Sequence, residues 1–178
     1  MPDKIKPPLV LTAICTIISA LLIIVYNATY VDTTGVITEE LSRGLDEIYG
    51  PGNYSMLLND DGSVRTYDGI TSVITNEKKQ LSFEIITDGY SKNGIHVLVG
   101  VSDNGVEGIS FIELGETPGL GTKVRDEKDF TRQFIGAADN SYDFDTITGA
   151  TFSSKGVKEA VDTALTVYNQ YKEDFVSE

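Results

Sequence analysis

The sequence predicts an α+β fold, in which an antiparallel sheet with packed helices follows one N-terminal transmembrane helix. Three observations predict it: an uncharged apolar run near the N-terminus, two strand-like runs joined by a glycine-containing turn, and a helical pattern near the C-terminus. The 178 residues, 40% of them hydrophobic, suffice for one ordinary core plus an appendage. We expect a cytoplasmic N-terminus and membrane helix in residues 1–31, a connector and weakly patterned α/β region in residues 32–80, and the core in residues 81–178.

The N-terminal apolar run has the length of one membrane span. Residues 7–31 contain no charged residue, and the centre of the run, residues 9–26, is apolar except for three hydroxyl side chains. Such a helical segment extends about 27 Å, close to the hydrocarbon thickness of a bilayer. Tyr26 and Tyr30 lie where interfacial anchors are expected. A cleaved signal peptide is the alternative, but the run is long for one and no Ala-x-Ala site follows it.

Charges that flank this run predict the orientation of the chain. Lys4 and Lys6 precede the run, whereas Asp32, Glu39 and Glu40 follow it. Lys and Arg concentrate on the cytoplasmic side of membrane proteins. We therefore expect a single-pass protein of the cell membrane, anchored in the lipid bilayer, with a cytoplasmic N-terminus and an extracytoplasmic domain.

Composition excludes several classes of function. The net charge is −13, the isoelectric point is near 4.4, and no stripe of Lys and Arg exists, so nucleic acid is not a partner. Cys15 is the only cysteine and His96 the only histidine. The chain therefore cannot build a disulfide framework, a Cys/His metal site, an iron–sulfur cluster or a recognisable Ser-His-Asp set. Any redox cofactor must be organic, and we expect His96 to be structural.

Local patterns predict the first elements after the membrane run. Residues 38–49 place three apolar side chains on one helical face: Leu41, Leu45 and Ile48. Gly50-Pro51 then stops the helix, so this segment should be a short amphipathic helix. Turn clusters at residues 59–63 and 77–80 predict short strands between and around them.

Alternation and a hairpin turn predict the sheet. Apolar residues alternate with other residues over 81–86, and residues 95–101 and 106–114 form two further strand-like runs. Asp103-Asn104-Gly105 joins the last two runs, and an Asn-Gly step favours a hairpin because both residues tolerate positive φ. These runs should pair as an antiparallel sheet.

The segment from Asp145 to Gly156 is where we expect the chemistry, because small residues and hydroxyls immediately precede a helix. Apolar residues recur at helical spacing from Ser153 onward: Val157, Ala160, Val161, Ala164, Leu165, Tyr168 and Tyr171. The helix should begin near Ser153, which puts Thr148 to Thr151 at its N-terminal end. Unpaired N–H groups and the helix dipole would stabilise an anionic group there, such as a phosphate. A hydroxyl-rich N-cap with a tight glycine turn is the plainer alternative.

A glycine-rich loop follows the last strand-like run. Four of the eleven positions from Glu113 to Lys123 are Gly or Pro. Such a loop exposes backbone groups and admits a flat ligand close to the main chain, with Leu120 available to cover a ring face. An ordinary Pro-Gly surface turn uses the same residues.

Four motifs in a fixed order carry a resemblance to a known family: Gly89-Tyr90, the strand Gly94 to Gly100, Glu116 to Gly121, and Asp145 to Thr151 ahead of a helix. They resemble the FMN-binding domain shared by the G subunit of the Rnf ion-translocating electron-transport complex and the C subunit of the sodium-pumping NADH:quinone oxidoreductase. The resemblance covers most of residues 81–171, and the segment from Gly89 to His96 looks more like the Rnf version. It implies a membrane helix followed by an FMN-binding core.

The resemblance also implies the cofactor and its site. In this family the pattern Asp, two variable residues, Ser or Thr, Gly, Ala, Thr marks flavinylation, and its last threonine carries FMN through a phosphoester. That residue is Thr151 here, and Thr148 stands where many members have Ser. The other expected cofactor-binding residues are Tyr90, Glu116, Thr117, Pro118, Gly119, Leu120, Gly121, Gly149, Ala150 and Ser153. No catalytic residue and no metal site are expected.

The implied function is electron transfer through covalent FMN, within an Rnf-type ion-translocating ferredoxin:NAD oxidoreductase and without independent turnover. Implied partners are the other membrane and peripheral subunits and an FAD:protein FMN transferase, which moves FMN from FAD to Thr151 and releases AMP. An external enzyme is needed because a threonine hydroxyl is a poor nucleophile unaided and no histidine lies near it in sequence. The alternatives are the C subunit of the quinone reductase, a membrane-anchored flavin sensor, or an anchored module with an empty loop.

Overall fold

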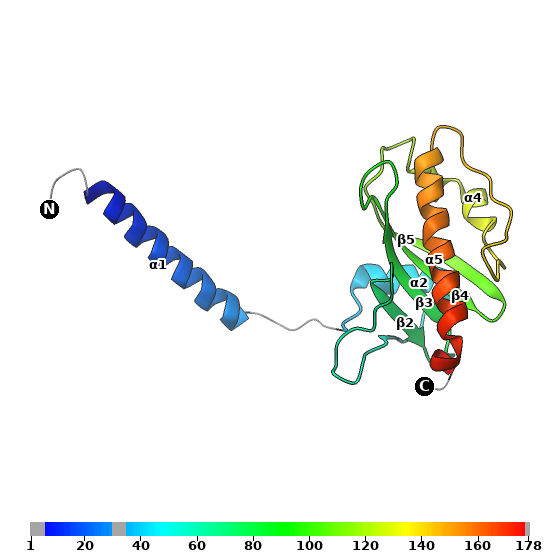
Figure 1. Ribbon diagram of the computed structural model, residues 1–178, viewed down its shortest axis with the longest axis horizontal. Coiled ribbons are helices and arrows are strands. Elements are labelled where there is room, and N and C mark those ends of the chain that lie inside the picture. The colour runs from blue at the N-terminus through cyan, green and yellow to red at the C-terminus, as the bar shows by residue number, and fades with distance from the viewer. Residues whose placement is uncertain (1–5, 30–34, 177–178) are drawn as a thin grey trace. The chain divides into compact units, whose positions relative to one another are not determined.

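The chain forms two compact units, Met1–Thr33 and Thr34–Glu178, which are described separately. The computed structural model describes residues 6–29 and 35–176 (Figure 1). The expected roles of Lys4, Tyr30 and Asp32 therefore lie outside the described residues.

The first unit contains one long apolar helix, α1 (Lys6–Thr29). Within it, the segment Pro8–Thr29 contains an 18-residue window with a mean hydropathy of 2.7, and no residue of that window is buried. Thr12 and Thr16 donate hydrogen bonds to the carbonyls of Pro8 and Thr12, one helical turn earlier. Such bonds satisfy hydroxyl groups inside an apolar helix. By length and composition, α1 is consistent with the predicted membrane anchor.

The second unit is an α+β domain, as the sequence predicts. Its elements are α2 (Glu39–Tyr49), β1 (Tyr54–Met56), β2 (Ser72–Asn76), β3 (Leu81–Thr87), β4 (Ile95–Ser102), β5 (Gly105–Leu114), α3 (Lys123–Asp126), α4 (Lys128–Arg132) and α5 (Thr151–Val176). The five strands form one antiparallel sheet in the order β1-β2-β3-β4-β5. Because β1 and β2 belong to this sheet, residues 35–80 are continuous with the core and no break separates them from residue 81 onward.

Helix α2 covers part of one face of the sheet. The Thr38 hydroxyl caps it by accepting a hydrogen bond from the amide of Leu41, and Gly50 ends it with a φ of 84°. A small cluster of buried residues lies beneath it: Leu41, Leu45, Ile74 and Leu98. The predicted amphipathic helix is confirmed, with its apolar face directed at the sheet.

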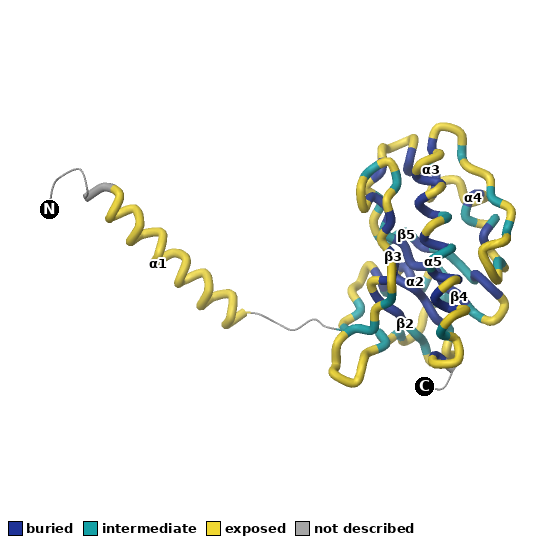
Figure 2. Tube along the Cα trace, viewed as in Figure 1, coloured by how far each residue is buried: buried dark blue, intermediate teal, exposed yellow. Residues whose placement is uncertain are grey.

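The main core lies on the other face, between the sheet and α5 (Figure 2). Six of the seven predicted apolar residues of α5 are buried here, and Tyr171 is partly buried: Val157, Ala160, Val161, Ala164, Leu165 and Tyr168 are the buried six. Phe83 and Ile85 of β3 and Val97 and Val99 of β4 are fully buried in the same cluster. The apolar residues of α5 recur at helical spacing, and those of β3 alternate, because both sets face the same core between the helix and the sheet.

The turn between β4 and β5 differs in detail from the prediction. Ser102 pairs with Gly105, so Asp103 and Asn104 make the turn and only Gly105 adopts positive φ, at 96°. A Cβ atom at Gly105 would lie 2.5 Å from the carbonyl oxygen of Ala137. The glycine is needed at the first position of β5, where the backbone turns and a neighbouring loop approaches closely.

His96 forms a polar cluster with Glu84 within the sheet. Its Nε2 lies 2.8 Å from one carboxylate oxygen of Glu84, and the Ser72 hydroxyl donates to the other. All three residues are largely buried, and the cluster joins β2, β3 and β4. His96 thus makes a structural contact.

Acid should weaken the fold through Glu84. Burial acts to raise the pKa of Glu84, but hydrogen bonds from His96 and Ser72 outweigh it and hold the pKa below its usual range. A depressed pKa contributes stability that is present above the unfolded-state pKa, near 4.5, and is lost as the pH falls through the folded-state value. We expect thermal unfolding of Glu84→Gln to depend less steeply on pH below about pH 4.5 than that of the parent. Parallel curves of Tm against pH for the two proteins would contradict this.

Candidate functional site

The start of α5 forms the centre of the candidate site. The helix begins at Thr151, two residues before the predicted start at Ser153, because the Ala150 carbonyl already accepts a helical hydrogen bond from the Ser154 amide, at 2.8 Å. Gly149, with a φ of 84°, turns the chain into the helix. Thr151 is therefore the first helical residue and is exposed. The first-turn amides, which have no acceptors within the helix, lie beside its hydroxyl.

Two consecutive buried serines hold the segments around this helix start. Ser154 accepts a hydrogen bond from the Ile147 amide at 3.1 Å, which ties the preceding turn to the helix. Ser153 donates a short hydrogen bond to Glu116. These two hydroxyls connect both predicted motifs to the first turn of α5. The sequence interpretation did not single out Ser154.

Glu116 is a buried junction between three segments. Its carboxylate, in a residue only 5% exposed, accepts hydrogen bonds from the amides of Tyr90 at 3.2 Å and Ser91 at 3.0 Å, as well as from Ser153. These partners compensate the cost of removing a carboxylate from water. Three glycines surround it so closely that a Cβ atom on any of them would lie 2.5 Å from a carboxylate oxygen: Gly89, Gly94 and Gly121. The sequence predicted Glu116 as a site residue but not this anchoring role.

A cavity of about 360 Å³ opens between these segments. Its lining consists of Tyr90, Glu116, Thr117, Leu120, Gly121, Gly149, Ala150, Thr151, Phe152 and Ser153. All but Phe152 were predicted from the sequence. Its volume lies within the range of roughly 300–1,000 Å³ typical of small-molecule sites.

Three bulky side chains around the cavity are left open to solvent. Tyr90 is 76% exposed, Phe152 65% and Leu120 50%, and the rings of Tyr90 and Phe152 meet edge to face with centroids 6.3 Å apart. Exposed apolar side chains gathered beside a cavity with few convergent polar groups are typical of a site for a flat organic ligand. Phe152 was not predicted as a site residue, because it lies before the expected start of the helix at Ser153.

Three of the predicted site residues do not line this cavity. Gly119, with a φ of 74°, donates its amide hydrogen bond to the Thr122 hydroxyl at 2.9 Å and thereby shapes the loop. Pro118 is exposed beside it. Thr148 borders a different hollow, near Asp145 and α4.

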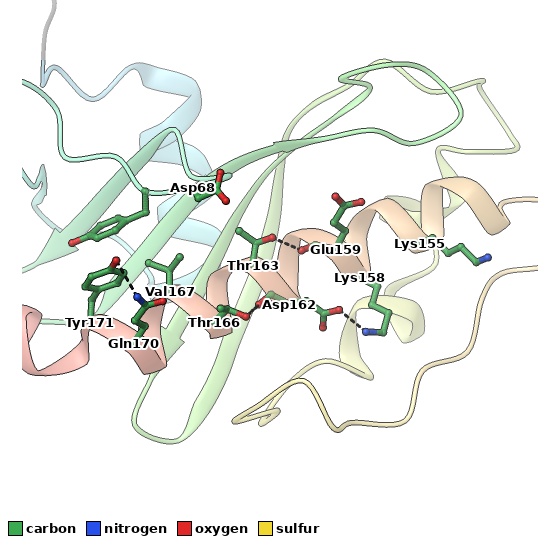
Figure 3. Close-up of a pocket in the computed structure, with 11 residues that line it drawn as sticks. Asp68, Lys155, Lys158, Glu159, Asp162, Thr163, Thr166, Val167, Gln170 and Tyr171 are labelled. Carbon is green, nitrogen blue, oxygen red and sulfur yellow. Dashed lines mark hydrogen bonds and ion pairs between the residues drawn. The ribbon is translucent and has the colours of Figure 1, made fainter.

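A groove of about 430 Å³ along the middle of α5 is a rival candidate (Figure 3). Several of its polar side chains are bonded within the protein. Lys158 pairs with Asp162 at 2.5 Å, and the Thr163 and Thr166 hydroxyls donate to carbonyls of their own helix. Asp162 also accepts a hydrogen bond from Tyr142, and burial together with this bond raises the pKa of that phenol. The lining of this groove is mostly charged and polar, and it includes none of the large exposed apolar side chains that border the cavity at Thr151. The cavity at Thr151 is therefore the better candidate for a flat organic ligand.

Comparison with known proteins assigns the class of this domain. Residues 89–166 match the family model of the FMN-binding domain. The match begins one residue before Tyr90 and extends into α5, so it contains every residue that lines the cavity at Thr151. The chain therefore contains an FMN-binding domain.

Several similar proteins are G subunits of ion-translocating oxidoreductase complexes. The G subunit of Shewanella baltica is 35% identical over 99 residues, which cover 48% of this chain and 46% of the relative. The G subunit of Vibrio cholerae is 32% identical over 134 residues, which cover 66% of this chain and 64% of the relative. The G subunit of the Na(+)-translocating ferredoxin:NAD(+) oxidoreductase complex of Acetobacterium woodii is 34% identical over 96 residues. These residues cover 46% of this chain and 45% of the relative. The chain thus spans about half to two thirds of the relatives it matches, and the resemblance seen in the sequence is confirmed.

Proposed function

We propose that this chain is a membrane-anchored electron-transfer subunit of an Rnf-type ion-translocating oxidoreductase complex and carries FMN covalently on Thr151. The observation that carries the proposal is the exposed Thr151 hydroxyl, which stands at the start of α5 and beside a cavity inside the matched domain. The relatives named above are all G subunits, which favours this assignment over the C subunit of a sodium-pumping quinone reductase.

The residues around Thr151 fit an attached FMN. Unpaired amides and the helix dipole would stabilise the single negative charge of a phosphodiester at the first turn. The apolar side chains of Tyr90, Leu120 and Phe152 suit a flat ring that lies over the cavity. FMN held there would supply a redox centre that exchanges electrons singly or in pairs.

Attachment uses a transferase, because within residues 6–29 and 35–176 no hydrogen bond joins the Thr151 hydroxyl to a side chain that could activate it as a base. His96, the only histidine, is hydrogen-bonded to Glu84. In the proposed reaction the Thr151 oxygen forms a bond to the FMN phosphorus of FAD, the phosphoanhydride bond breaks, and AMP leaves. The hydroxyl proton passes to a base on the FAD:protein FMN transferase. The exposure of Thr151 leaves it accessible to such an enzyme.

Denaturing electrophoresis tests this function directly. The full chain is co-produced with an FAD:protein FMN transferase or with an inactive variant of that enzyme, then denatured and examined for flavin fluorescence in the gel. We expect a fluorescent band only when the chain is co-produced with the active transferase. Flavin that copurifies but leaves in denaturant would overturn covalent attachment, and a chain without flavin under all conditions would overturn the function.

The domain should face the extracytoplasmic side of the membrane, because Lys4 and Lys6 precede the apolar run whereas Glu39 and Glu40 follow it. We expect protease added to right-side-out vesicles to digest residues 35–176 and protease added to inverted vesicles to leave them intact. Detergent-opened vesicles serve as the control for intrinsic cleavability. The reverse pattern of protection would show the opposite topology.

A further inference from the structure

The outer edge of β5 carries a second hollow, which shares no lining residue with the cavity at Thr151. Strand β5 is the last in the sheet order and pairs only with β4 among the named strands. A hollow of about 470 Å³ lies along it and is lined by Glu47, Ile109, Ser110, Phe111, Arg125, Lys128, Thr131 and Arg132. Helix α4 supplies three of these residues and contacts β5.

Side-chain directions place this hollow over the free edge itself. Ile109 and Phe111 pack against the main core on the α5 face of the sheet. Ser110 points to the opposite face, where its hydroxyl donates to Glu47 of α2 at 2.7 Å. A hollow bordered by all three must lie over the strand edge, because successive side chains of a strand alternate between faces.

The free stretch of this edge has a defined start. Val106 exchanges hydrogen bonds with the loop at residues 136–137: its amide donates to the Ala137 carbonyl at 2.9 Å, and its carbonyl accepts from the Gly136 amide at 2.8 Å. Past Val106, no strand of the described chain pairs with the outer side of β5. Unpaired backbone groups along an edge are a template for another strand.

The wall opposite this edge is basic, in a chain with a net charge of −13. Arg125, Lys128 and Arg132 all border the hollow. Arg125 pairs with Asp126 at 3.0 Å and Arg132 with Asp129 at 2.8 Å, but these pairs are at least half exposed. Exposed ion pairs contribute little and exchange readily for a new anionic partner. The one carboxylate in the lining, Glu47, already accepts the Ser110 hydrogen bond.

We propose that the free edge of β5 binds an extended, acidic segment of a partner protein as an added strand. Main-chain hydrogen bonds would attach the segment to β5, and its carboxylates would meet Arg125, Lys128 and Arg132. A strand edge presents alternating N–H and C=O groups, which a polypeptide can pair with and a phosphate or lipid headgroup cannot. This interaction rests neither on Thr151 nor on a bound flavin.

Defined peptides test the proposal on the full chain in detergent. The probes are three decapeptides, alternating Thr-Glu, alternating Thr-Lys and alternating Pro-Glu, with binding measured by fluorescence anisotropy and by hydrogen exchange of residues 107–113. We expect the Thr-Glu peptide to bind and to slow exchange in this stretch. The Thr-Lys peptide has the wrong charge. The prolines of the Pro-Glu peptide fix φ near about −65° and favour polyproline II geometry over a pleated strand, so neither peptide should do so.

A charge-reversal variant and a matched control complete the test. Arg125→Glu/Lys128→Glu/Arg132→Glu should weaken Thr-Glu binding at least about tenfold. The control variant, Lys78→Glu/Lys79→Glu/Lys172→Glu, changes three lysines that border another hollow. It changes the net charge by the same amount and should bind the Thr-Glu peptide as the parent does. Equal binding of the Pro-Glu peptide, or equal protection by inorganic phosphate, would show anion binding alone and overturn strand addition. Absence of Thr-Glu binding, or equal weakening by both variants, would also overturn the proposal.

Discussion

Thr151→Ala should abolish covalent flavin and leave the fold intact. Thr151 is an exposed first residue of α5, and the buried contacts at the helix start belong to Ser153 and Ser154. Loss of its hydroxyl should therefore cost less than the roughly 1 kcal/mol of a helix cap. The expected result is a complete loss of in-gel flavin fluorescence, with an unfolding temperature close to that of the parent.

Two further variants give this prediction its controls. Thr151→Ser keeps a hydroxyl at the same place and should retain modification, whereas Thr148→Ala removes a hydroxyl that lies outside the cavity lining. We expect Thr148→Ala to be modified more slowly, through altered geometry of the motif that the transferase meets. A fluorescent Thr151→Ala protein would refute the assignment of the attachment residue.

Gly121→Val should disrupt both the site and the fold. A Cβ atom there would lie 2.5 Å from a Glu116 carboxylate oxygen and 2.7 Å from the Ser153 hydroxyl oxygen, so the side chain enters the buried junction. Overpacking of this kind typically costs about 1–3 kcal/mol, and here it also displaces hydrogen bonds to a buried carboxylate. We expect a lower unfolding temperature together with weak flavinylation, measured on the same samples.

Gly119→Val is the matched control in the same loop. No atom lies within 4 Å of its Cβ position, so the variant strains only a backbone with a φ of 74°. It should retain covalent flavin and show a shifted flavin absorption band. The sequence places both glycines in one predicted loop without distinguishing them, and the structure separates them. Parent-like stability and flavinylation in Gly121→Val would show that the junction tolerates the added side chain.

Much of the fold follows from local patterns in the sequence. Helix α2 was predictable from its cap and stop residues. Helix α5 was predictable from the helical spacing of its apolar residues, which arises because one face of the helix is buried against the sheet. Strand β2 was harder to predict, since its buried Ser72 is stabilised by a tertiary partner, Glu84. Strand β1 has only three residues, too few for alternation to show.

The candidate site was predictable as two motifs but not as an assembly. The glycines and hydroxyls of each motif indicate a loop and a helix start, which are local features. The burial of Glu116 and its bonds to the amides of Tyr90 and Ser91 join residues about 25 positions apart, and no local pattern encodes them. The basic wall of the hollow at β5 was also not predictable from the sequence. Arg125 and Arg132 each lie close in sequence to an aspartate that they pair with, so no local excess of positive charge is seen there.

Tandem mass spectrometry of the proteolytic peptide that contains Thr151 tests the central claim most directly. The sample is the full chain, co-produced with an active FAD:protein FMN transferase and denatured before digestion. We expect the peptide to be heavier by one FMN less one water, with fragment ions that place the added mass on Thr151. An unmodified peptide, or fragment ions that place the added mass on Thr148, Ser153 or Ser154, would contradict the account.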